Sequence, residues 1–246
     1  MNLQDLIAQA TARLDAAQLA YGHGTTNAHD EAAWLVLWRL GLPLDSDLDA
    51  LAQRPITPEE SAQVLALIEQ RISSREPAAY LTNEAWLQGV PFYVDRRAIV
   101  PRSFIAELLA DGSIDPWLSE HTHDVLDLCT GNGSLAVLAA MAWPEIEVWA
   151  TDLSAPALEV AASNVRRHGL ESRIQLRQGD GLEAAPGRFD LILCNPPYVN
   201  RTSMRALPPE YRCEPALALD GGDDGMDFVR RLMAALPEHL APQGVL

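Results

Sequence analysis

A short motif with unusual hydrogen-bonding chemistry follows an apolar segment in the C-terminal part of the chain. Asn195-Pro196-Pro197-Tyr198 comes directly after residues 189–194, which are predicted to form a buried strand. The two prolines fix φ and donate no hydrogen bonds, so they hold the Asn195 side-chain oxygen and the Pro196 carbonyl as neighbouring acceptors. Two acceptors on a rigid backbone suit a substrate that presents an NH₂ group with two hydrogens.

Such a pair of acceptors would activate a poor nucleophile. The nitrogen of a planar amine or amide has a delocalised lone pair, and holding both N–H bonds turns that lone pair toward an incoming methyl group. The Tyr198 ring can lie against a planar substrate, and its face attracts a nearby sulfonium. We therefore predict Asn195, Pro196 and Tyr198 as catalytic residues, and these three with Pro197 as the substrate-binding residues. The alternative is an ordinary proline-rich turn.

A second motif predicts a nucleoside site. Gly131 and Gly133 lie between a predicted strand and a predicted helix, where glycine allows a ligand to approach the backbone. Asp152 ends the next predicted strand, 19 residues after Gly133, where an acid can accept hydrogen bonds from ribose hydroxyls. Asp180 ends the strand after that. Two acids beside the glycine turn favour a nucleoside site over solvated loop residues or helix caps.

The glycine turn alone leaves the identity of the nucleoside open. The run from Gly131 to Ala136 also fits the G-x-G-x-x-A pattern of dinucleotide sites, so NAD is an alternative. S-adenosylmethionine differs in presenting an ammonium, a carboxylate and a sulfonium. Asp127, inside the first strand, can bind the ammonium or be paired in the core. The Asn195 motif favours the methyl donor, S-adenosyl-L-methionine.

Strands alternate with helices in the second half of the chain. This order predicts an α/β fold with a doubly wound, Rossmann-like parallel sheet that binds its ligand at the strand C-termini. A last helix is predicted at about 226–240, and residues 244–246 begin another strand. Because the sheet would end on an unpaired apolar edge, we expect a longer protein whose C-terminal strands are missing here. The predicted strands are 124–129, 147–151, 173–178 and 189–194.

The N-terminal part has a different pattern. Apolar spacing predicts helices at 2–20 and 28–40 and a third that begins at Pro58, with Thr57 as its N-cap and Glu60 completing a capping box. Next come a hairpin with its turn at Gly89-Val90-Pro91, a short extended piece at 98–100 and a helix at 104–110 capped by Ser103. The expected domains are a helical substrate-recognition domain (1–80), a connector (81–111) and a methyltransferase domain (112–246).

Composition and charge limit the partners. The chain has 246 residues, 48% of them hydrophobic, and a net charge of −16. No apolar run approaches the roughly 18 residues of a membrane span, and three cysteines make no disulfide framework, so we expect a cytoplasmic protein without a membrane partner. Excess negative charge repels a phosphate backbone and attracts basic proteins, so no direct nucleic-acid binding is expected. His121 and His123 are predicted to lie in a solvated loop, and no metal site is expected.

The residues also carry a family resemblance. Asp127-Leu128-Cys129-Thr130-Gly131-Asn132-Gly133 together with the Asn195 motif resembles class I S-adenosylmethionine-dependent amino-methyltransferases, and the whole layout resembles HemK-like protein glutamine methyltransferases. Segments 79–82, 86–94 and 100–108 look like the branch that modifies large-subunit ribosomal protein three. The release-factor branch has an acidic-Thr-Glu run after its Pro-Arg, which is absent here. Residues 214–217 and 221–225 also match the family, whereas Asn83 replaces a glycine and Cys213 a histidine.

The resemblance implies a reaction and a role for each site residue. It implies methyl transfer from S-adenosylmethionine to the side-chain amide of a glutamine in a basic ribosomal protein. Asp127, Thr130 and the Gly131–Gly133 backbone would hold the methionine part, Asp152 the ribose and Asp180 the adenine edge. Asn195 would lie beside the cofactor and, with Pro196, orient the amide.

Several alternatives remain open at this point. The same chemistry could act on peptide release factors or on an exocyclic amine in nucleic acid. An NAD-linked oxidoreductase and a non-enzymatic, ribosome-binding helical adaptor are further alternatives.

Overall fold

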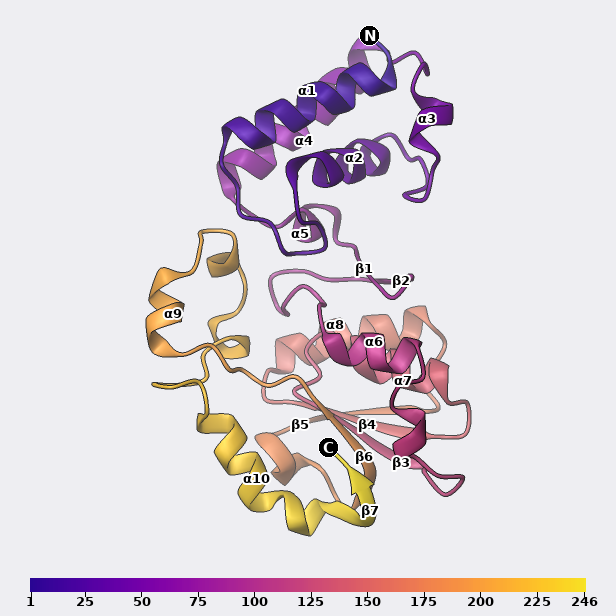
Figure 1. Cartoon of the computed structure of the whole chain (residues 1–246), viewed down its shortest axis with the longest axis vertical. Helices are drawn as coiled ribbons and strands as arrows, with labels where there is room; N and C mark the ends of the chain where they lie inside the picture. The colour runs from indigo at the N-terminus through magenta and orange to yellow at the C-terminus, as the bar shows by residue number, and fades with distance from the viewer. The chain divides into compact units, whose positions relative to one another are not determined.

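The computed structural model describes residues 1–246. The chain divides into two compact units: Met1–Asn83 with Pro208–Cys213, and Glu84–Leu207 with Glu214–Leu246 (Figure 1). None of the helices combines the length and the apolar character needed to cross a bilayer.

The first unit is helical. α4 begins as predicted, with the Thr57–Glu60 capping box and Pro58 in its first turn. α1 ends four residues before the predicted position because Gln18 has a left-handed backbone, with φ of 49°. Its core consists mainly of apolar side chains from α1, α2 and α4. The helices are α1 (Leu3–Ala16), α2 (Ala28–Arg39), α3 (Leu48–Leu51), α4 (Pro58–Ser74), α5 (Ala78–Thr82) and the 3₁₀ turn η3 (Tyr211–Cys213).

A segment from far along the sequence completes this helical unit. Glu210 has a fully buried side chain whose Oε1 accepts a hydrogen bond from Arg75 Nη1 at 3.0 Å. The Tyr211 hydroxyl donates to the Tyr21 carbonyl at 3.2 Å. Residues 208–213 therefore belong to the first unit, although the chain on both sides of them belongs to the second.

The second unit is built on a parallel sheet of five strands in the order β5-β4-β3-β6-β7. β4, which follows β3 in the chain, pairs with one edge of β3, and β6 pairs with the other edge. The direction in which strands are added to the sheet therefore reverses between β3 and β6. Open sheets bind ligands outside the carboxyl ends at such a reversal. The predicted doubly wound sheet is confirmed. The strands are β3 (Asp124–Leu128), β4 (Glu147–Asp152), β5 (Ile174–Gln178), β6 (Phe189–Cys194) and β7 (Leu240–Val245).

Helices cover both faces of this sheet. Val125 of β3 packs in one apolar cluster with α6, α7 and α8, whereas Leu126 and Leu128 pack in another with η2 and α10. Alternate residues of one strand thus face opposite layers. The helices are α6 (Phe104–Ala110), α7 (Ser134–Ala142), α8 (Ala155–Arg167), α9 (Arg201–Ala206) and α10 (Asp227–His239), with 3₁₀ turns η1 (Asp115–Trp117), η2 (Gly181–Ala184) and η4 (Ala216–Ala218).

The predicted hairpin is present with a shifted turn. β1 (Ala85–Leu87) pairs with β2 (Val90–Phe92), and Gln88 and Gly89 form the turn with φ of 49° and 74°. Two positive φ values are typical of a type I′ turn, which matches the twist of the flanking strands. Asn83, which stands where the family has glycine, adopts a left-handed conformation, with φ of 52°. The extended piece predicted at 98–100 forms no strand.

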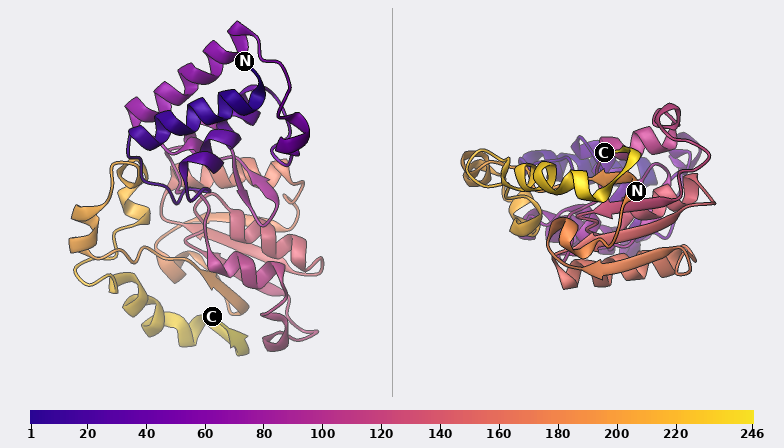
Figure 2. Two further views of the ribbon diagram at one scale, coloured as in Figure 1. Left: turned by 45° about the horizontal axis from the view of Figure 1, so that its top comes forward. Right: turned by 90° about the horizontal axis from the view of Figure 1, so that it is seen from below.

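Four strands have a boundary that differs from the prediction, and two of them differ little: β4 ends one residue later and β5 begins one residue later than expected. β7 starts at Leu240 instead of residue 244 and lies at the sheet edge beside β6 (Figure 2). It can contain Pro242 because an edge strand tolerates a missing N–H. β3 ends at Leu128, so Cys129, with φ of 61°, lies outside the strand in which it was predicted. The expected continuation of the sheet beyond Leu246 stays a prediction.

Candidate active site

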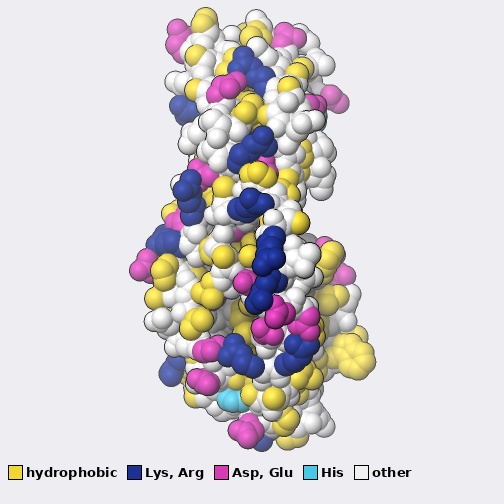
Figure 3. Space-filling view, turned by 90° about the vertical axis from the view of Figure 1, so that its left-hand side faces the viewer, with side chains coloured by type: hydrophobic (Ala, Val, Ile, Leu, Met, Phe, Trp, Pro, Cys, Tyr) yellow, Lys and Arg dark blue, Asp and Glu magenta, His cyan; other side chains and the backbone are white.

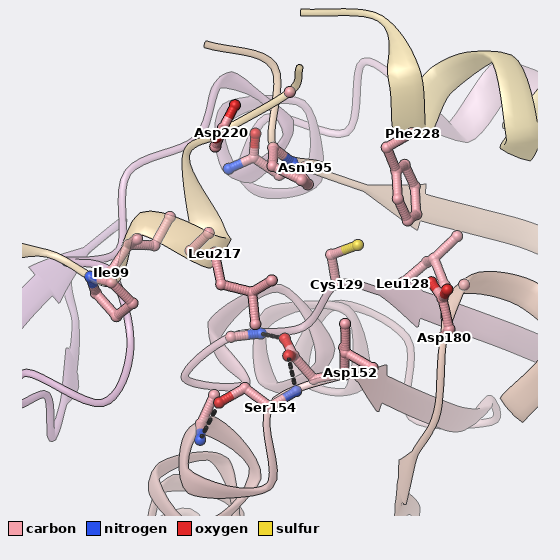
Figure 4. Close-up of a pocket in the computed structure, with 18 of the residues that line it drawn as sticks. Ile99, Leu128, Cys129, Asp152, Ser154, Asp180, Asn195, Leu217, Asp220 and Phe228 are labelled. Carbon is pink, nitrogen blue, oxygen red and sulfur yellow. Dashed lines mark hydrogen bonds between the residues drawn. The ribbon is translucent and has the colours of Figure 1, made fainter. Parts of the chain in front are cut away.

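A cavity of about 580 Å³ lies at the carboxyl ends of the strands in the second unit. This volume is in the usual range for small-molecule sites, about 300–1,000 Å³. Of the predicted site residues, Gly131, Asp152, Asp180, Asn195 and Pro197 line the cavity (Figure 4). The other predicted site residues do not line the cavity, although each lies within two residues of one that does: Asp127, Thr130, Gly133, Pro196 and Tyr198.

Asp152 joins the end of β4 to the glycine turn. Its Oδ2 accepts a hydrogen bond from Gly131 N at 2.9 Å, and its Oδ1 accepts one from Ser154 N at 2.8 Å (Figure 4). Burial raises the pKa of this carboxyl, and the backbone hydrogen bonds oppose that rise. Each carboxylate oxygen keeps a second lone pair for a ligand hydroxyl.

The two glycines of the turn serve different purposes. Gly131, with φ of 57°, lines the cavity, and a Cβ added to it would meet no atom within 4 Å. A side chain there would project into open space that a ligand can use. A Cβ on Gly133 would lie 3.1 Å from Ala161 Cβ, so this glycine allows α8 to pack closely on the turn.

Asp127 supports the turn from behind. It is fully buried, and its Oδ2 accepts hydrogen bonds from Thr130 Oγ1 at 2.5 Å and from Ala136 N at 3.0 Å. Burial, more than the nearby charge of Asp152, raises the pKa of Asp127 to about 7. Its other oxygen is buried without a hydrogen-bond partner. The direct contact of Asp127 with a ligand ammonium stays a prediction.

One end of the cavity combines an acid with an aromatic ring. The Asp180 carboxylate, after β5, accepts hydrogen bonds from Arg231 at 2.8 and 3.2 Å, and these bonds lower its pKa. Phe228 of α10 lines the same end (Figure 4). An ionised acceptor beside a ring fits a flat heterocycle with an amino group. The sequence did not mark Phe228 or Arg231 as site residues, because a single aromatic or basic residue in a predicted helix does not indicate contact with a ligand.

The acceptor corner, residues 195–198, has unused hydrogen-bonding groups. The Asn195 side chain lines the cavity and forms no hydrogen bond with the rest of the chain (Figure 4). The Pro196 carbonyl accepts no backbone hydrogen bond. The Tyr198 side chain is 63% exposed. Both predicted acceptors are therefore unused within the chain, and Asn195 is the one that lines the cavity.

The backbone of the acceptor corner is held by residues 219–225. Val199 N donates to Leu219 O at 2.8 Å, and Gly221 N donates to Val199 O at 2.9 Å. A Cβ on Gly225 would lie 2.4 Å from Tyr198 O. Only glycine permits this approach, and a Cβ on Gly221 would likewise lie 2.8 Å from Tyr198 Cα, so both glycines are explained by the close backbone contact.

Cysteine and histidine side chains of the second unit have the following surroundings. Cys129 lines the cavity, and its interaction with Cys194 together with burial raises the pKa of its thiol, so the thiol is neutral. Both cysteines are half-buried. His121 and His123 lie exposed in their loop, and no group of three His, Cys, Asp or Glu side chains is arranged around a metal position.

The parallel sheet, the glycine turn and the acceptor corner define the second unit as a class I methyltransferase. The family model described as Methyltransferase small domain matches residues 113–207, and the one described as PrmC N-terminal domain matches residues 5–82. A solved structure of a ribosomal protein L11 methylase from Lactobacillus delbrueckii subsp. bulgaricus aligns with a TM-score of 0.41 at 23% identity, over 58% of each chain.

Curated relatives identify the family. A "Ribosomal protein uL3 glutamine methyltransferase" of Bordetella pertussis is 56% identical over 99% of this chain and 82% of its own length. The protein of the same name from Burkholderia pseudomallei is 50% identical over the same shares. The chain belongs to the family of ribosomal protein uL3 glutamine methyltransferases. The HemK-like resemblance and its ribosomal-protein branch are thereby confirmed.

Proposed function

We propose that this chain transfers a methyl group from S-adenosyl-L-methionine to the side-chain amide nitrogen of a glutamine in ribosomal protein uL3. The observation that carries the proposal is the Asn195 amide, which faces the cavity with no partner in the chain. The names of the relatives support the substrate and do not favour release factors or nucleic acid.

The residues that line the cavity fit the cofactor. Asp152 offers acceptors to the ribose hydroxyls, and Asp180 with Phe228 suits the adenine ring. The Gly131 backbone, held by Asp152, would lie along the methionine part, with Asp127, Thr130 and Gly133 shaping the turn behind it. When bound, the cofactor supplies an electrophilic methyl group on a sulfonium.

The acceptor corner would orient the substrate. Asn195 Oδ1 and the Pro196 carbonyl would accept hydrogen bonds from the two N–H groups of the glutamine amide. This arrangement turns the nitrogen lone pair toward the methyl group. The C–N bond forms as the C–S bond breaks, and the nitrogen then releases one proton to water. Both acceptors stabilise the positive charge on nitrogen before that proton leaves. Tyr198 packs beside the amide at the exposed rim.

Charge supports a basic protein partner. The net charge of −16 favours encounter with a basic ribosomal protein in the cytoplasm. On the face drawn in Figure 3, basic side chains are interspersed with acidic ones. Arg230 pairs with Asp224, and Arg201 pairs with Asp223.

We propose that the N-terminal helical unit recognises the substrate protein.

Mass spectrometry tests the proposal. The chain is incubated with S-adenosylmethionine and unmethylated uL3, with a release factor in a parallel reaction. We expect a mass gain of one methyl group on uL3, located on a glutamine by fragmentation, and none without the cofactor. Methylation of the release factor alone, or of no protein, would contradict the proposed substrate.

A further inference from the structure

Two loops that are far apart in sequence form one wall of the cavity. Residues 97–99 of the connector and residues 215–218 after the acceptor corner both line it. Figure 4 shows Ile99 and Leu217 on the same side of the cavity, away from Asp180 and Phe228. We call these two stretches the roof loops. Neither belongs to the sheet that carries Asp152 and Asn195, so the sheet does not fix their positions.

An ion pair between the partly exposed Arg102 side chain and a buried carboxylate connects the roof loops. Glu214, whose side chain is fully buried, directly precedes the second loop. Its Oε1 accepts hydrogen bonds from Val100 N at 2.9 Å and Arg102 Nη1 at 2.7 Å, and its Oε2 accepts one from Arg102 Nη2 at 2.6 Å. Arg102 Nη1 also donates to the Val100 carbonyl at 2.9 Å. The bidentate pair thus fixes residues at the end of one roof loop and the start of the other.

We propose that Arg102 and Glu214 are positioning residues that hold the roof loops against the cofactor. Neither residue lines the cavity, so the pair acts through Ala98, Ile99 and the 215–218 loop. The planar guanidinium fork fixes direction as well as distance, which a lysine could not do. This inference rests on the proposed cofactor but not on the identity of the methyl acceptor.

A double substitution separates positioning from charge burial. Arg102→Met alone leaves the Glu214 carboxylate buried without its partner, which is strongly destabilising. Arg102→Met combined with Glu214→Gln removes both charges, and neutral replacement of a buried pair is often tolerated. We expect the double variant to regain the melting temperature lost in the single variant. Its bidentate link between the loops is still missing, so its affinity for the cofactor should stay low.

The measurements are calorimetric binding of S-adenosylmethionine and hydrogen exchange without ligand. The amides of Leu219 and Asp220 both donate to the Ala216 carbonyl, and they report on the second roof loop. We expect the double variant and Glu214→Gln to bind the cofactor about tenfold more weakly and to exchange these amides faster. At saturating cofactor, kcat should stay within about threefold of wild type, because Asn195 is untouched.

A matched control is Glu60→Gln, which breaks a partly exposed ion pair with Arg54 in the helical unit. It should leave cofactor affinity and loop exchange unchanged. Wild-type affinity or unchanged exchange in the double variant would overturn the positioning role. Failure of the wild-type chain to bind S-adenosylmethionine would instead contradict the proposed function, and the exchange measurement would still decide whether the pair orders the loop.

Discussion

The two sides of the cavity are built in opposite ways. On the cofactor side, the Asp152 and Asp127 carboxyl groups accept hydrogen bonds from the glycine turn and its flanks, so the turn is shaped within the chain itself. On the acceptor side, Asn195 forms no side-chain hydrogen bond, and only the backbone of its corner is held. One side is preorganised by its own side chains, and the other leaves its side-chain polar group without a partner in the chain, as the proposed substrate binding requires.

This difference implies that each side can be damaged without the other. Removing a group from the acceptor corner should slow methyl transfer and leave cofactor binding intact. Removing a group from the cofactor side should weaken cofactor binding first. The two effects appear separately in kcat and in the dissociation constant.

The largest effect is expected for Asn195→Ala. Losing one of the two acceptors removes stabilisation of the charge that develops on the amide nitrogen, and we expect kcat to fall about 10²- to 10³-fold. The affinity for S-adenosylmethionine should change by less than about threefold. Asn200→Ala is the matched control, since Asn200 lies in the same loop and caps α9. Equal losses in both variants would show that the loop, and not the acceptor, matters.

The next effect is expected for Asp152→Ala. The substitution removes two backbone hydrogen bonds and the acceptors that we propose for the ribose, and hydrogen bonds to a charged group contribute about 1.5–3 kcal/mol each. We expect the dissociation constant for S-adenosylmethionine, measured by calorimetry, to rise about 10- to 100-fold. Glu147→Gln, at the exposed start of the same strand, is the control. An unchanged dissociation constant would remove Asp152 from the cofactor side.

A smaller effect is expected for Gly225→Ala. The added Cβ would lie 2.4 Å from Tyr198 O, so the backbone of the acceptor corner must shift. We expect kcat to fall about tenfold with little change in cofactor affinity, because small displacements of positioning groups slow a reaction. Gly187→Ala is the control: Gly187 also has positive φ, 98°, but a Cβ there meets no atom within 4 Å. Similar kinetics for both variants would show that backbone strain alone is responsible.

The sequence predicted the sheet side of the site better than the opposite side. Asp152 is the last residue of β4, and Asp180 and Asn195 follow β5 and β6 within two residues. Parallel strands bring their carboxyl ends to one edge, so the strand pattern placed all three together. Arg231 and Phe228 lie in a helix whose register against the sheet depends on tertiary packing, so no local pattern marked them. The sequence marked Glu214 only as part of a family motif. Its ion pair was not predicted, because Arg102 lies more than a hundred residues earlier in the chain.

The depth of Asp127 below the glycine turn accounts for both its place outside the cavity and its titration. In the folded chain the pKa of the Asp127 carboxyl is about 7, whereas the ordinary pKa of an aspartate is 3.8. Between these values the unfolded chain releases a proton that the folded chain retains, so this group lowers the free energy of unfolding as pH rises. Its stabilising contribution is complete below pH 3.8 and is lost as pH passes 7.

Asp127→Asn tests this assignment with the smallest expected effect on activity. The amide keeps an oxygen to accept from Thr130 and Ala136 and cannot ionise. In urea unfolding between pH 4 and 8, we expect the variant to gain stability relative to wild type as pH rises. Asp95→Asn is the control: hydrogen bonds from Arg97 lower the pKa of Asp95 to about 2, so its difference from wild type should stay constant over this range. A constant difference for Asp127→Asn would mean that the carboxyl is ionised throughout, and direct binding of the cofactor ammonium would then become the better account.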